Sequence, residues 1–174
     1  QKIKAAIDEV GYISAWQHRV AVQEPLATSE TIMFEQIGRR PIVSMRGTTR
    51  ETYEFPNQLS EHLETTPGIR TLSLLGIGYT PNMFAVETFM DELAGELGVD
   101  PLAFRLQHLK KSERGQRVLN AVAEQAAWGK PRAKGRELGL AFADYHHTLL
   151  AGIAEISLED TQIKVHEFWV AIDP

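Results

Sequence analysis

The chain has 174 residues, 43% of them hydrophobic and 24% charged, which is enough apolar material for one sizeable core or two subdomains. Its formal net charge is -5, and its basic residues are scattered, which argues against a nucleic-acid partner. No apolar run approaches the roughly 20 residues needed to span a bilayer. The chain has no cysteine, which excludes disulfides, iron–sulfur ligation and a thiol nucleophile within it. The compartment, cytoplasmic or periplasmic, stays open.

The first part of the chain predicts strands and a long connection. Residues 2–7 and 12–22 are rich in β-type residues around a turn at residues 8–11, so we expect a β-hairpin. Residues 23–56 contain several prolines and glycines without lasting periodicity, which indicates an irregular connection with short strands. Residues 69–75 are again strand-like.

Three helices are predicted next. Thr80 and Pro81 are typical of a helix start, and Gly98 of a helix end. An apolar stripe at helical spacing is expected to be buried in this first helix: Met83, Val86, Met90, Leu93 and Leu97. Asp100 before Pro101 predicts a second helix, and Ser112 caps a third that reaches about residue 127.

The last part returns to strands, at residues 135–158 and 162–172, with a turn at residues 160–161. The order of strands, helices and strands favours an α+β fold over a regularly alternating α/β sheet. We therefore expect mixed sheet segments with a central group of about three helices.

A glycine loop precedes the first helix. Gly76, Ile77 and Gly78 form a loop whose backbone can adopt a positive φ or pass close to a ligand. The free N–H groups of a helix start can also bind an anion or a cofactor. An ordinary tight turn is the alternative, because Gly-x-Gly alone is a weak signal.

An ordered set of short motifs surrounds this loop. It comprises Gly76-Ile77-Gly78, Pro81-Asn82, Phe84-Ala85 with Glu87, Asp91-Glu92-Leu93-Ala94, Asp100-Pro101-Leu102 and Arg105-Leu106. The set resembles the molybdenum hydroxylases. More narrowly, it is similar to the molybdopterin-binding large subunit of the xanthine dehydrogenase and aldehyde oxidase family, on the branch that includes isoquinoline 1-oxidoreductase.

The resemblance implies a molybdenum–molybdopterin cofactor in the full-length protein, with Gly76, Ile77 and Gly78 beside the molybdenum centre. It also implies hydroxylation of an aldehyde or N-heterocycle, with electrons passed to a 2Fe-2S small subunit. The family's catalytic glutamate motif is absent, so we assign no catalytic residue and no metal ligand here. We expect a fragment, inactive alone, with both ends cut. Residues 1–131 would end one molybdopterin-binding domain, and residues 132–174 would begin the next.

Two positions depart from the family pattern. Leu75 stands where an arginine often precedes the glycines, and Ile77 stands where better-known members place an aromatic residue. The competing hypothesis is therefore a noncatalytic binding or scaffold module that keeps the fold without a working molybdenum site.

Other polar residues are weaker candidates. His146-His147 is the one histidine pair, and we expect it on a strand, where adjacent side chains point to opposite faces. A structural or surface role is favoured, with Tyr145 and His146 kept as candidates for lining a site. Glu87 and Asp91 share a helix face and could act as acid and base if buried, although a structural Glu87 and a solvated Asp91 are favoured.

Overall fold

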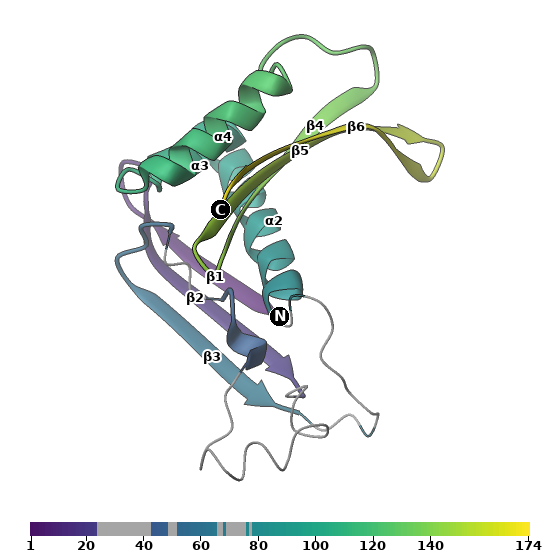
Figure 1. Ribbon diagram of the computed structural model, residues 1–174. Helices are drawn as coiled ribbons and strands as arrows, with labels where there is room; N and C mark the ends of the chain where they lie inside the picture. Colours follow the sequence, from purple (N-terminus) through teal and green to yellow (C-terminus); the bar gives the residue numbers. More distant parts are fainter. Residues whose placement is uncertain (24–42, 49–51, 66–67, 69–75, 77) are drawn as a thin grey trace. The chain divides into compact units, whose positions relative to one another are not determined.

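The computed structural model describes residues 1–23, 43–48, 52–65, 68, 76 and 78–174. These residues contain three α-helices and two three-stranded sheets, one of them mixed, which confirms the predicted α+β class (Figure 1). Contacts divide the chain into two compact units, residues 1–51 with 55–89 and residues 52–54 with 90–174. The division falls within helix α2 (Tyr79–Leu97). The boundary at residue 131 concerns domains of a longer protein, and it stays a prediction.

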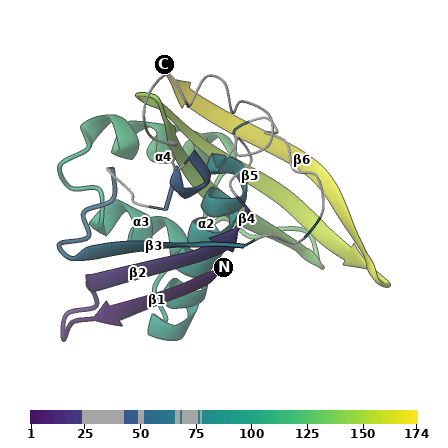
Figure 2. The ribbon, with the colours of Figure 1, turned by 90° about the horizontal axis from the view of Figure 1, so that it is seen from below.

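The first unit contains a mixed sheet whose strands lie in the order β1 (Lys2–Ile7), β2 (Ile13–Val22) and β3 (Gln58–Glu64) (Figure 2). The antiparallel hairpin of β1 and β2 was predicted and is confirmed. Strand β3 was missed. It pairs parallel to β2, and its sequence QLSEHLE has only two large apolar residues, both exposed, so no alternation marks it.

A bulge in β2 organises the core of this unit. The register pairs Ala6 with Ala15 and Ile7 with Ile13, which leaves Ser14 as an extra residue. An extra residue reverses the alternation of faces, so Ile13 joins Trp16 on the buried side. The Trp16 ring stacks on Phe55 at 4.8 Å between ring centroids and meets the edge of Phe89 at 5.5 Å.

Helix α2 follows its prediction in part. Val86 and Met90 are fully buried, but Met83 and Leu93 are half-buried and Leu97 is exposed. The buried line instead runs at a spacing of four residues: Asn82, Val86, Met90 and Ala94. A purely apolar pattern misplaced the stripe because this line begins with a polar residue and ends with a small one.

The second unit packs two helices, α3 (Pro101–Gln107) and α4 (Glu113–Gln125), with an antiparallel sheet of three strands. These are β4 (Arg136–Tyr145), β5 (Thr148–Glu159) and β6 (Gln162–Asp173), in that order. Both predicted caps are confirmed, since Asp100 accepts from the Ala103 N–H at 2.9 Å and Ser112 from the Gly115 N–H at 3.1 Å. None of the helices in the described part of the chain combines the length and apolar character that a bilayer crossing requires.

Helix α4 covers one face of this sheet and contacts β5 and β6. The predicted apolar face of α4 is buried: Val118, Leu119, Val122 and Ala126. Alternate residues of β5 are buried on the matching face: Leu149, Ala151, Ile153 and Glu155. The other alternate residues of β5 lie on the opposite face of the sheet.

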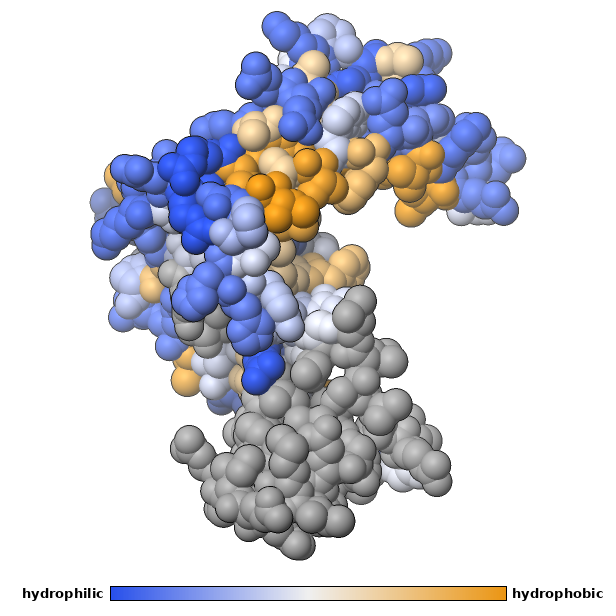
Figure 3. Space-filling model, in the orientation of Figure 1, coloured by the Kyte–Doolittle hydropathy of each residue, from blue (hydrophilic) through white to orange (hydrophobic). Residues whose placement is uncertain are grey.

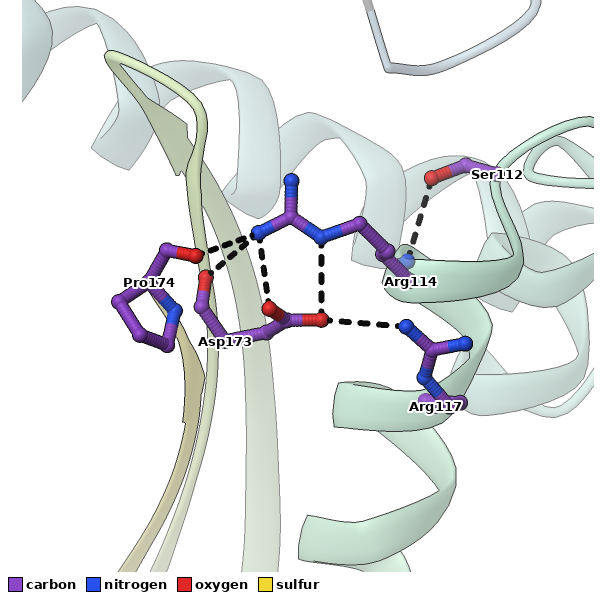
Figure 4. Close-up of polar contacts among 6 residues, drawn as sticks. Ser112, Arg114, Arg117, Asp173 and Pro174 are labelled. Atoms are coloured by element: carbon purple, nitrogen blue, oxygen red, sulfur yellow. Dashed lines mark hydrogen bonds and ion pairs between the residues drawn. The ribbon is translucent and has the colours of Figure 1, made fainter.

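Two arginines of α4 hold the end of β6 (Figure 4). Arg114 donates to both carboxylate oxygens of Asp173, at 3.0 and 2.8 Å, and to the main-chain oxygens of Asp173 and Pro174. Arg117 adds a longer contact of 3.4 Å to Asp173. The hydrogen bonds from Arg114 lower the pKa of Asp173, so this carboxylate stays charged and the final residues of the strand stay fixed to α4.

Candidate functional site

The described residues of the predicted loop, Gly76 and Gly78, lie in turns just before α2. Of the loop's three residues, Ile77 lies outside the described residues, as does Leu75 before it. Gly76 has a φ of 78°, and its carbonyl accepts the N–H of Tyr79 at 2.9 Å. Gly78 is buried, and its carbonyl accepts the N–H of Asn82 at 3.1 Å as the helix begins. The helix starts at Tyr79, so Pro81 is its third residue and Thr80 lies inside the helix instead of capping it.

The space beside Gly76 is occupied by the chain itself. A Cβ atom at this position would lie 2.4 Å from the Oγ1 of Thr80, well inside any real contact. The left-handed backbone and the close hydroxyl are two separate reasons for a glycine here. Both arise within the turn. They account for Gly76 without a ligand, and proximity of this loop to a cofactor stays a prediction.

The side chain of Asn82, near the loop, forms hydrogen bonds through both its nitrogen and its oxygen. It is fully buried, and its Nδ2 donates to the main-chain oxygens of Ser44 at 2.7 Å and Arg46 at 2.9 Å. Its Oδ1 accepts from the Nε2 of Gln1 at 2.9 Å. One amide thereby ties the start of α2 to two segments distant in sequence. The motif Pro81-Asn82 was noted in the sequence, but this role was not, because local sequence says nothing about a partner more than 30 residues away.

His18 extends the same hydrogen-bonded chain. Its Nε2 lies 3.0 Å from the Oε1 of Gln1, and the ring is fully buried. Burial, aided by the positive amino terminus and opposed by a backbone hydrogen bond with Thr48, lowers the pKa of His18 to about 4. The ring is therefore neutral at pH 7. A neutral, buried histidine that hydrogen-bonds an amide supports the fold and offers no charge to a ligand.

The acidic residues of the motif set also serve the fold. Arg105 is fully buried, and its Nη1 donates to the Oδ1 of Asp91 at 2.7 Å and to the Pro101 carbonyl at 3.1 Å. Asp100 accepts the indole N–H of Trp128 at 2.9 Å besides capping α3. The expectation of a merely solvated Asp91 was wrong, since its half-exposed carboxylate pairs with a buried arginine. Glu87 is buried, as a structural residue of α2 should be.

The histidine pair forms a turn and not a strand. Tyr145 pairs with Thr148, so His146 and His147 are the two loop residues of the β4–β5 hairpin. Their φ angles are 48° and 71°, and both residues are exposed. The predicted strand position was wrong because this two-residue turn has positive φ at both central residues, a conformation usually signalled by Asn or Gly and here adopted by two histidines. Tyr145 packs its ring against His146 at 4.5 Å.

The described residues supply no protein ligand set for a metal ion. No set of three or more His, Cys, Asp or Glu side chains among them is arranged to hold a metal ion. The room beside Gly76 is filled by Thr80. Four polar residues of the motif set form hydrogen bonds within the chain: Asn82, Asp91, Asp100 and Arg105. What the described part of the region provides is a turn and the start of a helix.

Comparison with known proteins gives two relatives, while no family model matches the chain. The chain is 32% identical over 126 residues, 70% of its length, to the beta subunit of isoquinoline 1-oxidoreductase from Brevundimonas diminuta. It is 34% identical over 109 residues, 58% of its length, to a subunit of nicotinate dehydrogenase from Pseudomonas putida. The matched segments make up 16% and 9% of these relatives, so the chain spans a small part of their length. The resemblance predicted from the sequence is confirmed: the chain shows partial homology to the large subunits of molybdenum hydroxylases.

Proposed function

We propose that the chain is part of the large subunit of a molybdopterin-dependent oxidoreductase that hydroxylates an N-heterocycle or an aldehyde. The observation that carries this proposal is the similarity to two such subunits over most of the chain. Both relatives are named for N-heteroaromatic substrates, isoquinoline and nicotinate, which favours an N-heterocycle over an aldehyde. Electrons would pass to a separate 2Fe-2S subunit, as the resemblance to this family implies.

Within that subunit, this segment would be architectural. The cofactor supplies the redox chemistry when bound, and the protein positions it. The buried amide of Asn82 fixes the start of α2, and the turn from Gly76 leads into that helix. We propose that this framework holds the main chain of Gly76, Ile77 and Gly78 against the cofactor, with Ile77 as an apolar wall of the substrate pocket. Residues 1–131 and 132–174 would belong to consecutive molybdopterin-binding domains.

The test uses the full-length subunit with its 2Fe-2S partner and a panel of N-heterocycles and aldehydes. We expect Gly78→Val to abolish hydroxylation, because a side chain there would block the approach of the backbone. Ile77→Phe should shift relative kcat/KM values among substrates, since a pocket wall discriminates by about 1 to 3 kcal/mol. The control is Thr88→Ala at an exposed position of α2, which should leave rates unchanged. Circular dichroism verifies that each variant is folded.

Two results would decide against this assignment. A Gly78→Val enzyme that stays folded and fully active would place the loop away from the site. A full-length subunit that binds molybdenum but hydroxylates no member of the panel would favour the noncatalytic module, for which Leu75 in place of an arginine is the supporting feature. For the isolated 174-residue chain, we expect metal analysis after dialysis to find no stoichiometric molybdenum.

A further inference from the structure

The second sheet has one face that no described element of its own unit covers. The strand register places a continuous set of large apolar side chains there, all at least partly exposed: Tyr145, Leu158, Ile163, Val165, Phe168, Val170 and Ile172. We name this set the open face. Ile163, Val165 and Phe168 are 70%, 60% and 64% exposed. Figure 3 shows hydrophobic residues gathered along this sheet.

The open face is built as regularly as the covered one. A bulge opposite Glu155 and Ile156 shifts the register of β6, and this keeps Val165 on the same face as Phe168 despite their odd spacing. The Phe168 ring lies over Gly152, where a Cβ would be 3.2 Å from the ring. A strand on the surface of a finished domain would place polar residues at these alternate positions. Their apolar character indicates a second packing layer.

The near absence of charged residues on the open face indicates a permanent interface. Within β4, β5 and β6, all of them described, the register places one acidic residue, Glu137, on the open face and no lysine or arginine. Permanent interfaces are apolar and depleted in charge, whereas transient electron-transfer contacts are small and more polar.

We propose that the open face packs permanently against another segment of the same polypeptide in a longer subunit. This inference rests on the proposed membership of a large subunit. The relatives are long enough to contain such a segment, because the matched segments are only 16% and 9% of their chains. A 2Fe-2S subunit and a second copy of the chain are the other occupants that the experiment must distinguish.

The experiment measures thiol labelling by a maleimide. The 174-residue chain has no cysteine, so Ile163→Cys and Phe168→Cys each introduce a single reactive site. Lys164→Cys is the matched control, on the same strand with its side chain on the opposite face. All three positions are exposed, and such surface substitutions rarely change stability by more than about 0.5 kcal/mol. Labelling is compared between the 174-residue chain and the full-length subunit purified without its 2Fe-2S partner.

We expect all three thiols to react rapidly in the 174-residue chain at a concentration where sedimentation shows a monomer. In the full-length subunit, labelling at positions 163 and 168 should slow by at least about tenfold relative to position 164. Equal rates in the full-length subunit would overturn the proposal, as would protection that develops only when the 2Fe-2S subunit is added. Protection within the 174-residue chain, or a dimer that persists on dilution, would also overturn it. Molybdenum content and hydroxylation test the proposed function separately, since labelling requires neither.

Discussion

Replacing Asn82 with alanine should destabilise the first unit strongly without touching any charged group. Asn82 is fully buried at the start of α2, and its amide donates to the carbonyls of Ser44 and Arg46. Alanine keeps the helix and removes both donors. The carbonyl of Ser44 then loses a buried hydrogen bond.

The magnitude follows from the two hydrogen bonds that Asn82 donates, and the loss of the oxygen that accepts from Gln1 adds to it. Each hydrogen bond is worth about 0.5 to 1.5 kcal/mol net, and a buried acceptor left without its donor costs about 1 to 3 kcal/mol. The bond to Ser44 is buried and the bond to Arg46 is partly buried, so their contributions differ. We expect Asn82→Ala to lower the free energy of unfolding of the first unit by about 2 to 4 kcal/mol.

Urea unfolding measures this loss. The chain has three tryptophans, and Trp16 lies in the first unit, packed against Phe55. A background with Trp128→Phe and Trp169→Phe makes Trp16 the single fluorescent reporter of that unit. Thr88→Ala, at an exposed position of the same helix, controls for helix propensity and should change stability by less than about 0.5 kcal/mol.

A second substitution sharpens the test. Asn82→Asp keeps the shape but turns an oxygen toward the two carbonyls, so at neutral pH we expect a loss at least as large as with alanine. A loss of unfolding free energy below about 1 kcal/mol for Asn82→Ala would contradict this expectation. It would mean that other groups form hydrogen bonds with the two carbonyls in the variant.

Three further outcomes are expected from the 174-residue chain. Met90→Ala should cost about 2 to 5 kcal/mol in urea unfolding, while the exposed Leu97→Ala should cost under about 1 kcal/mol, and equal losses would contradict the buried line of α2. Burial lowers the folded-state pKa of His18 from 6.5 to about 4, so the unfolded chain takes up its proton first. Stability should therefore fall by about 3 kcal/mol as pH drops from about 6.5 to 4, with no further loss from this group below 4, and His18→Gln should flatten that slope. Replacing the exposed turn residues with the pair His146→Asn and His147→Gly should raise stability by up to about 1 kcal/mol, because both φ angles are positive, and a lower urea midpoint would argue against that turn.

Local sequence determined most of the secondary structure. Asp100 and Ser112 each bond an N–H three residues ahead, and such a cap depends only on neighbouring residues. Residues 135–158 and 162–172 were predicted to be strand-rich, and the second of these ranges is indeed rich in β-type residues. The motif set from Gly76 to Leu106 was also enough to predict the family. Its residues proved to form turns, caps and ion pairs of the fold.

Tertiary structure decided what depends on distant partners. Strand β3 exists because its backbone pairs with β2, and its mostly polar sequence carries no sign of that pairing. Asn82 found its partners more than 30 residues away, and Asp91 is tied to a buried arginine in the next helix. Which apolar strand residues would be covered was equally beyond the sequence, since alternation shows that two faces differ but not which layer packs on each. Hydrogen bonds and burial between segments far apart in the chain are set by the fold as a whole, and a local pattern contains no record of them.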